Sequence, residues 1–386
     1  MLKKIFFSVF LLCNFLLYAE NNIYLDYFKK VNQAELHIAK SDYKGALEIY
    51  KALFDAYPHS FYKDVHNAAI CAIETKQYKD ALQLSKDLVL HGYELKDFDC
   101  SGFNALKNSK KQWKQFLSDY PKLRAQYEKT LDLPLREQYL TLFRIDQKAA
   151  GNYNNVRDMD SVFYRLATSV SNLIQKRSFQ HWMTKKDTIN FKLLAMLRHY
   201  CGLENRIKAS EAMQKDSLYI NMKKNDIRIL VNQALVDGLL LPEHYVAITT
   251  YSDSTNPYGE TAIEIDYDSE TIRPFLPIPI EKIEEVNQRR VSIGLPPVND
   301  LTQGMINATW YKEYPFKKIK EAWLACDTCI TMRDYLFVAK KIELEVKNNY
   351  EYDKGCLIIQ NMTKITNIYL KGGREYQKNL IPRKKE

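Results

Sequence analysis

The chain has little glycine and little proline, with 12 of each among 386 residues. So few breaker residues argue against long flexible linkers and favour helices over an architecture with many turns. After residue 19 no apolar stretch approaches the roughly 20 residues of a membrane-spanning helix, so we expect no transmembrane segment there. A phosphate-binding glycine loop, an H-E-x-x-H zinc motif and a G-x-S-x-G nucleophile motif are also absent. The sequence therefore predicts no cofactor and no particular enzyme class, and it leaves open whether the protein is an enzyme.

The first 19 residues have the three parts of a cleavable signal peptide. Lys3 and Lys4 are followed by the nearly apolar residues 5–17, and Ala19 is a small residue at the cleavage position. An uncleaved N-terminal anchor is the alternative. Lipidation at Cys13 is disfavoured, because Leu12 precedes it where a small residue is expected. We therefore expect an exported protein of the periplasm or cell envelope.

The net charge of +9 is spread along the chain. Nucleic-acid binding would need a concentrated basic stripe with interleaved aromatic residues, and an exported protein rarely meets nucleic acid. We therefore expect no nucleic-acid partner. The sequence gives no indication of the oligomeric state.

Six cysteines follow the signal peptide, and an even number permits disulfides in an oxidising compartment. Cys326 and Cys329 form a C-x-x-C, for which three interpretations stay open: structural cysteines, a disulfide, or a redox pair. No βαβ pattern precedes this motif and no second C-x-x-C completes a zinc site. No histidine has a second one at metal-ligand spacing, so we predict no metal site.

A pattern recurs with a step of 35 residues in the N-terminal part of the chain. Its first copy is Ala34, Ser41, Tyr43, Ala46, Tyr50, Leu53 and Pro58, and its second is Ala69, Lys76, Tyr78, Ala81, Ser85 and Leu88. This spacing resembles the tetratricopeptide repeat, whose period is about 34 residues, over residues 27–91. An unrelated pair of antiparallel helical hairpins is the alternative. Because two repeats leave an end uncovered, we expect residues 92–127 to form a degenerate third hairpin.

Composition and periodicity divide the rest of the chain. Residues 22–130 are predicted to be the repeat domain, 131–300 a mostly helical domain with a β-hairpin over 260–277, and 301–386 a helical extension with a basic tail. Helices are predicted over 135–180, over 191–200 with an end at Gly202, and over 227–240. The expected fold class is mainly α, with tetratricopeptide-like hairpins packed on an α+β domain.

Three short motifs stand out near the end of the 131–300 region: Tyr-Gly-Glu-Thr at 258–261, Asn-Gln-Arg-Arg at 287–290 and Gly-Leu-Pro-Pro at 294–297. With them, residues 135–301 resemble an uncharacterised domain family of bacterial, often exported, proteins, whose signature is a Tyr-Gly-Thr-Gln motif, an Asp-x-Arg-Arg motif and a final Gly-Leu-x-Pro. Asn287 replaces the Asp of the second motif, and the family's Gln-His-x-Asp and Asp-Arg stretches are missing. The family has no established function, so the resemblance implies no activity.

The polar residues that match this family form the candidate site. They are Arg144, Asp146, Asp187, Asn190, Tyr258, Gly259, Arg289 and Arg290. The two adjacent arginines could bind a carboxylate or phosphate, or could bridge the last helix to the rest of the domain.

Two hypotheses for the function follow. In the first, the protein is a non-enzymatic interaction module whose repeats bind a protein or peptide. In the second, it is an enzyme of unknown class with its site among these polar residues. The second requires Asp146, Asp187 and Tyr258 to converge in one pocket, whereas their use as helix caps would count against it.

Overall fold

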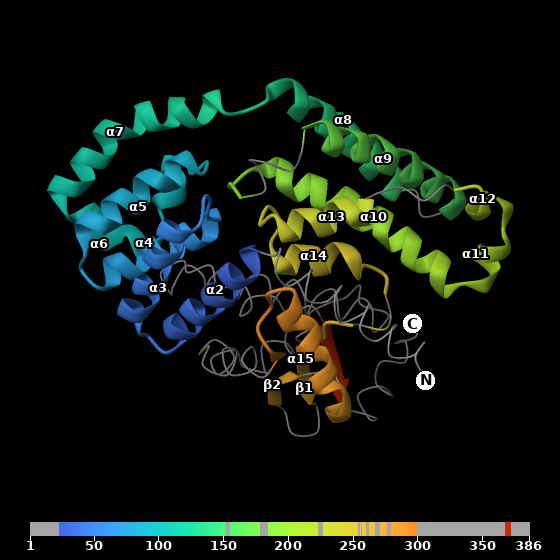
Figure 1. Ribbon diagram of the computed structural model, residues 1–386. Helices are drawn as coiled ribbons and strands as arrows, with labels where there is room; N and C mark the ends of the chain where they lie inside the picture. Colours follow the sequence, from blue (N-terminus) through green and yellow to red (C-terminus); the bar gives the residue numbers. More distant parts are fainter. Residues whose placement is uncertain are drawn as a thin grey trace, which may run out of the picture.

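The structure, a computed structural model shown in Figure 1, describes residues 23–151, 155–177, 184–222, 227–253, 255, 257–259, 262–266, 271–275, 279–298 and 367–371. The predicted signal peptide and the C-x-x-C of Cys326 and Cys329 lie outside these residues, as does most of the predicted extension. In the described part the protein is mainly helical, as the sequence predicts. No described helix combines the length and apolar composition that crossing a membrane requires.

The first four helices form two antiparallel hairpins, drawn in blue in Figure 1. They are α2 (Ile23–Ala39), α3 (Tyr43–Ala56), α4 (Tyr62–Glu74) and α5 (Tyr78–Leu90). The turns inside the hairpins are equivalent, because Ser41 and Lys76 both have a left-handed backbone, with φ of 60° and 59°. The next amides repeat as well: Asp42 N donates to His37 O at 2.9 Å, and Gln77 N donates to Ala72 O at 2.8 Å. The turn conformation therefore repeats with the same period of 35 residues as the sequence pattern.

Small residues let the helices of these hairpins approach closely. The four repeat alanines are fully buried, and so are the repeat leucines between the hairpins: Ala34, Ala46, Ala69, Ala81, Leu53 and Leu88. Tyr50 fills this space in the first hairpin. Ser85 takes the equivalent place in the second, where it is buried and its hydroxyl donates to Ala81 O at 2.7 Å.

The open end of the hairpins is covered by the next segment. It consists of η1 (Leu95–Phe98), η2 (Ser101–Phe103), α6 (Asn104–Asn108) and α7 (Lys110–Lys129), and α7 packs against α5. The expected third hairpin is only half formed, because short turns replace its first helix. Among the large apolar residues of this segment, Phe98, Phe103, Leu106 and Phe116 are buried, whereas Leu117 is exposed.

Seven helices follow, drawn from green to yellow in Figure 1. They are α8 (Leu133–Ala150), α9 (Val156–Arg177), α10 (Thr188–Ala209), α11 (Glu211–Lys215), α12 (Ser217–Ile220), α13 (Ile227–Val236) and α14 (Pro242–Thr249). The Asp132 side chain caps α8 by accepting from Leu135 N at 3.0 Å, which marks the start of this part. The single helical region predicted over 135–180 is two helices, with α8 ending at the C-cap Gly151.

The predicted helix end at Gly202 is wrong. Helix α10 continues through this glycine to Ala209, so Gly202 lies in the helix interior. The glycine is needed for packing, because a Cβ there would lie 2.6 Å from Cδ1 of Tyr251. The aromatic ring therefore lies directly on the helix backbone.

Three short strands and one helix complete the described structure. Strands β1 (Ala262–Asp266) and β2 (Thr271–Phe275) pair antiparallel, and β3 (Asn367–Lys371) pairs parallel with β1. Between β2 and β3 along the chain lie the 3₁₀ turn η3 (Ile280–Lys282) and the helix α15 (Ile283–Ser292). The grouping of these strands with the helices of 131–300 into one α+β domain stays a prediction.

The hairpins of α2 to α5 share a core with the helices that follow them. Leu235 and Leu241, which lie after the hairpins in the chain, belong to the same cluster of buried apolar side chains as the residues of α2 to α5. A second cluster lies among α8, α9, α10, α13 and α14. The hairpins therefore dock on the following helices instead of standing free.

Candidate functional site

Asp187 and Asn190 hold the start of α10. The Asp187 side chain caps this helix by accepting from Ile189 N at 3.0 Å, and it forms an ion pair with Arg136 of α8. Asn190 Nδ2 donates to Lys185 O at 2.8 Å. These contacts are those of a helix cap and of a junction between two helices.

Arg289 and Arg290 connect α15 to the loop before the strands. Arg290 is buried; its Nε donates to Pro296 O at 2.6 Å and its Nη1 to the carbonyls of Tyr258 and Gly259 at 2.9 and 3.2 Å. Arg289 donates to Pro257 O at 2.6 Å and pairs with a glutamate one turn earlier on α15. Burial lowers the pKa of Arg290 to about 10. The arginines thus bridge the helix to the domain body, which is one of the two interpretations of the sequence.

Asp146 has a partner that the sequence does not reveal. Its carboxylate is buried and lies 2.9 and 3.0 Å from Nδ1 of His199 on α10, and it also accepts from Gln147 Nε2 at 2.8 Å. The His199 ring stacks on Phe163 with a centroid distance of 4.7 Å. The nearby Arg144 instead forms an exposed ion pair with Glu137. Asp146 therefore orients an imidazole that is partly open to solvent.

The predicted site residues do not converge in one place, although Arg290 binds the backbone of Tyr258 and Gly259. Asp187 stands at the start of α10, and His199 lies twelve residues further along, roughly 18 Å at 1.5 Å per residue. Tyr258 belongs to a third place, where its carbonyl binds Arg290 and its ring contacts Tyr245. The structure thus distributes the eight residues over separate contacts.

A buried group of charges lies elsewhere, on the hairpins. Lys63 of α4 is 3% exposed, and its Nζ lies 3.1 Å from Glu35 Oε1 and 3.1 Å from Asp64 Oδ1. Tyr27 donates its hydroxyl proton to Asp64 Oδ2 at 2.6 Å. Burial alone would lower the pKa of Lys63, but the attraction of Asp64, Glu35 and Glu243 outweighs burial and raises it. The ammonium is therefore charged and held by carboxylates inside the protein.

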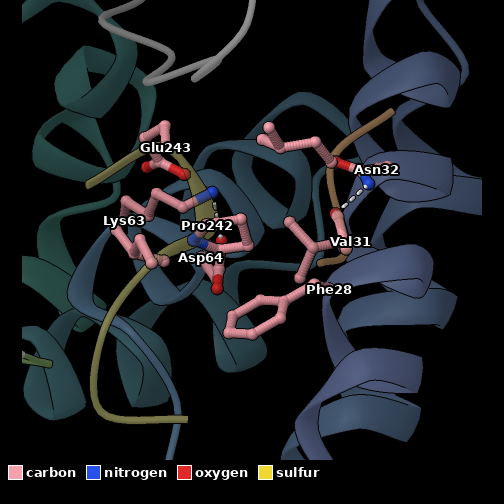
Figure 2. A pocket seen from close by; sticks show the side chains of 10 residues that line it. Phe28, Val31, Asn32, Lys63, Asp64, Pro242 and Glu243 are labelled. Atoms are coloured by element: carbon pink, nitrogen blue, oxygen red, sulfur yellow. Dashed lines mark hydrogen bonds and ion pairs between the residues drawn. The ribbon is translucent and has the colours of Figure 1, made fainter. Parts of the chain in front are cut away.

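A small pocket adjoins these charges where the two parts of the molecule meet (Figure 2). It is lined by Phe28, Val31, Asn32, Lys63, Asp64, Leu241, Pro242, Glu243, Gly294 and Leu295. The space accommodates about one water molecule, whereas ligand sites typically measure about 300–1,000 Å³. The pocket is therefore a seam between packed segments and not a cavity for a substrate.

None of these interior residues stands out in the sequence. Lys63 and Asp64 are neighbouring charged residues at a helix start, and Glu35 lies 28 positions before Lys63. A lysine followed by an aspartate is usually exposed to solvent. The pocket beside Lys63 and Asp64 is closed by segments far away in the sequence, with Leu241, Pro242, Glu243, Gly294 and Leu295 in its lining.

Comparisons with protein-family models, with curated proteins and with solved structures give no match for this chain. The two resemblances stated above therefore rest on the quoted residues alone. Within the described ranges, no group of three or more His, Cys, Asp or Glu side chains is arranged to hold a metal ion. Cys71 and Cys201 carry free thiols, and Cys100 is disulfide-bonded.

Proposed function

We propose that the protein is exported and acts as a protein- or peptide-interaction module built on tetratricopeptide-like repeats. The observation that carries this proposal is the repetition of turn geometry and of buried alanines at a step of 35 residues. Stacked helical hairpins of this kind form extended binding surfaces. The three-part N-terminus and the disulfide at Cys100 support an oxidising compartment.

For residues 131–300, we propose an α+β domain of the uncharacterised exported family. The support is the pairing of β1 with β2, in which Ala262 faces Phe275, together with the Arg290 contacts to the Tyr258–Gly259 backbone. In this proposal Arg289 and Arg290 hold the loop of residues 257–259 against α15. Their match to the family pattern then needs no chemical role.

Site-specific photo-crosslinking in the cell envelope tests the interaction proposal. A crosslinking amino acid replaces Leu117 on α7, which is 43% exposed, or as a control Ile145 on α8, which is 46% exposed. We expect a discrete crosslinked partner from position 117 that excess unlabelled protein competes away. Position 145 should give none. Equal products from both positions, or no competition, would contradict the proposal.

Export has its own test, the N-terminal sequence of the mature protein from the producing cell. We expect it to start at Glu20, directly after Ala19. A chain that retains Lys3 and Lys4 and stays with the membrane fraction would establish the anchor alternative instead.

A second candidate function is an enzyme that uses His199 as a general base. The specific observation is the buried Asp146 carboxylate on Nδ1, which fixes the imidazole and leaves Nε2 for proton transfer. Gly202 lies about one helical turn after His199 on α10. A Cβ added to Gly202 would lie 3.3 Å from Oγ of Ser252, whose φ is 61°. This hypothesis therefore assigns the Ser252 hydroxyl, on strained backbone, as the nucleophile of an acyl transfer.

This enzyme hypothesis is tested with a panel of simple esters and amides. Any turnover by the mature protein should fall by about 10²–10⁴-fold in His199→Ala if the imidazole is the base. The matched control is His37→Ala, because His37 also binds a carboxylate, Asp42, at 2.7 Å but on the surface. Turnover that both variants keep, or the absence of any turnover, would remove the hypothesis.

A further inference from the structure

The hairpins have an inner face that the rest of the chain covers. We define the inner face by Tyr24, Phe28 and Asn32 of α2 and by Lys63 and Asp64 of α4. All residues of α4 from 63 to 73 are buried, so no side of this helix is open to solvent. A row of hairpins with a free groove would expose one side of its inner helices. Here other segments of the same chain take that place.

One covering segment, residues 238–243, runs from the turn after α13 into the first turn of α14, and we call it the closing segment. Its first residue, Gly238, has a φ of 66°, and a Cβ there would lie 2.1 Å from Cγ of Tyr24. The Tyr24 ring stacks on His59 at 4.6 Å, and His59 Nε2 lies 3.0 Å from Gly238 O. Only glycine fits at this point, because neither the backbone angle nor the ring leaves room for a side chain.

After Gly238 the closing segment runs through Leu239 and Leu240, which pack on the second cluster, and it ends in the carboxylate of Glu243. Leu241 joins the core of the hairpins, and Pro242 starts α14 beside the pocket. Figure 2 shows the Glu243 side chain next to the Lys63 ammonium, which Glu243 attracts. A second strip lies alongside, where Asn32 Nδ2 donates to Gly294 O at 2.8 Å.

These contacts have the composition of a bound peptide. In the closing segment a leucine, a proline and an acidic side chain at the start of a helix meet an aromatic surface and a buried lysine. A buried charge gives little net stability over a well-packed apolar pair. The charged residues at this junction are therefore better explained by selection of an occupant than by stability.

We propose that this contact is autoinhibitory: the closing segment occupies the inner face, and a peptide with the same leucine–proline–acidic order binds there only after the segment has left. This inference rests on the proposed interaction function. Binding of a competing peptide is weakened by the fraction of molecules that are open, so an open population of about 1% lowers the apparent affinity about 100-fold. A mutation that opens the contact should therefore raise the apparent affinity for the peptide by this factor.

The test uses the full-length mature chain and a fluorescent peptide with the sequence of residues 236–244. Gly238→Ala pushes a methyl group into the Tyr24 ring and opens the contact, whereas Gly151→Ala is the matched control. At Gly151 the nearest atom to an added Cβ is 3.5 Å away, which is ordinary contact. We expect saturable binding to Gly238→Ala, at least about tenfold tighter than to wild type and to the control. A peptide with Glu243 replaced by lysine should not bind.

A folded Gly238→Ala protein that binds the peptide no better than wild type overturns the proposal. If Gly238→Ala does not fold, Glu243→Lys opens the same contact by repulsion from Lys63 and takes its place. Wild type supplies an independent measurement: excess peptide should accelerate hydrogen exchange in residues 238–243, and unchanged exchange at saturating peptide contradicts the proposal. The photo-crosslinking needs a partner and this experiment does not, so the autoinhibition and the interaction function can fail separately.

Discussion

Replacing Lys63 by methionine should destabilise the hairpins strongly. The substitution keeps most of the side-chain volume but removes the ammonium that lies 3.1 Å from Glu35 and from Asp64. Both carboxylates are then buried without that charge, and removal of one partner of a buried ion pair costs about 3–5 kcal/mol. With a urea dependence of about 2 kcal/mol per molar, the unfolding midpoint should fall by roughly 2 M.

The assay is urea unfolding of the mature protein, followed by far-UV circular dichroism. Lys30→Met is the matched control, because Lys30 pairs with Asp26 at 2.8 Å but both side chains are about half exposed. An exposed pair contributes roughly 0–1 kcal/mol, so this control should change little. Adding Glu35→Gln to Lys63→Met should recover part of the loss. A Lys63→Met protein within about 1 kcal/mol of wild type would refute the buried charge group.

Three further predictions concern buried groups. Burial raises the pKa of Tyr27 and Tyr50 well above 10, so the folded state holds both phenols neutral, and the protein should lose stability as the pH rises above about 10. Absorbance at 295 nm should show that these phenols ionise only on unfolding. Burial raises the pKa of the Cys71 and Cys201 thiols to about 12, so about one in 10⁴ is ionised at pH 8, and iodoacetamide should label them only in denaturant. Gly202→Ala should lower stability by about 1–3 kcal/mol in thermal unfolding, because its methyl group overlaps the Tyr251 ring.

The hairpins could be predicted because their determinants are local. The alanines at 34, 46, 69 and 81 recur at fixed spacing, and each hairpin turn is closed by hydrogen bonds within a few residues. The same local reasoning fails at Gly202, because a glycine often ends a helix but this one lies inside α10. There a distant residue, Tyr251, decides the outcome by packing on the helix backbone.

The interior polar contacts could not be predicted, because they join residues far apart in sequence. His199 lies 53 positions after Asp146, and no spacing rule connects them. The sequence resemblance does select Asp146 and Arg290, both of which are buried, but it does not say what they bind. Lys63 carries no sequence signal at all, since Glu35 and Glu243, two of the carboxylates that act on it, lie 28 and 180 positions away.

The inner face of the hairpins is closed by the protein's own chain in solution. Hydroxyl-radical footprinting of the mature protein tests this closure directly, with internal references of the same residue type. Phe28 is 4% exposed and Phe191 is 70% exposed. The closed structure predicts that Phe191 is oxidised rapidly and that Phe28 is protected until the protein unfolds. Oxidation of Phe28 at a rate comparable to that of Phe191 in the folded protein would contradict the account.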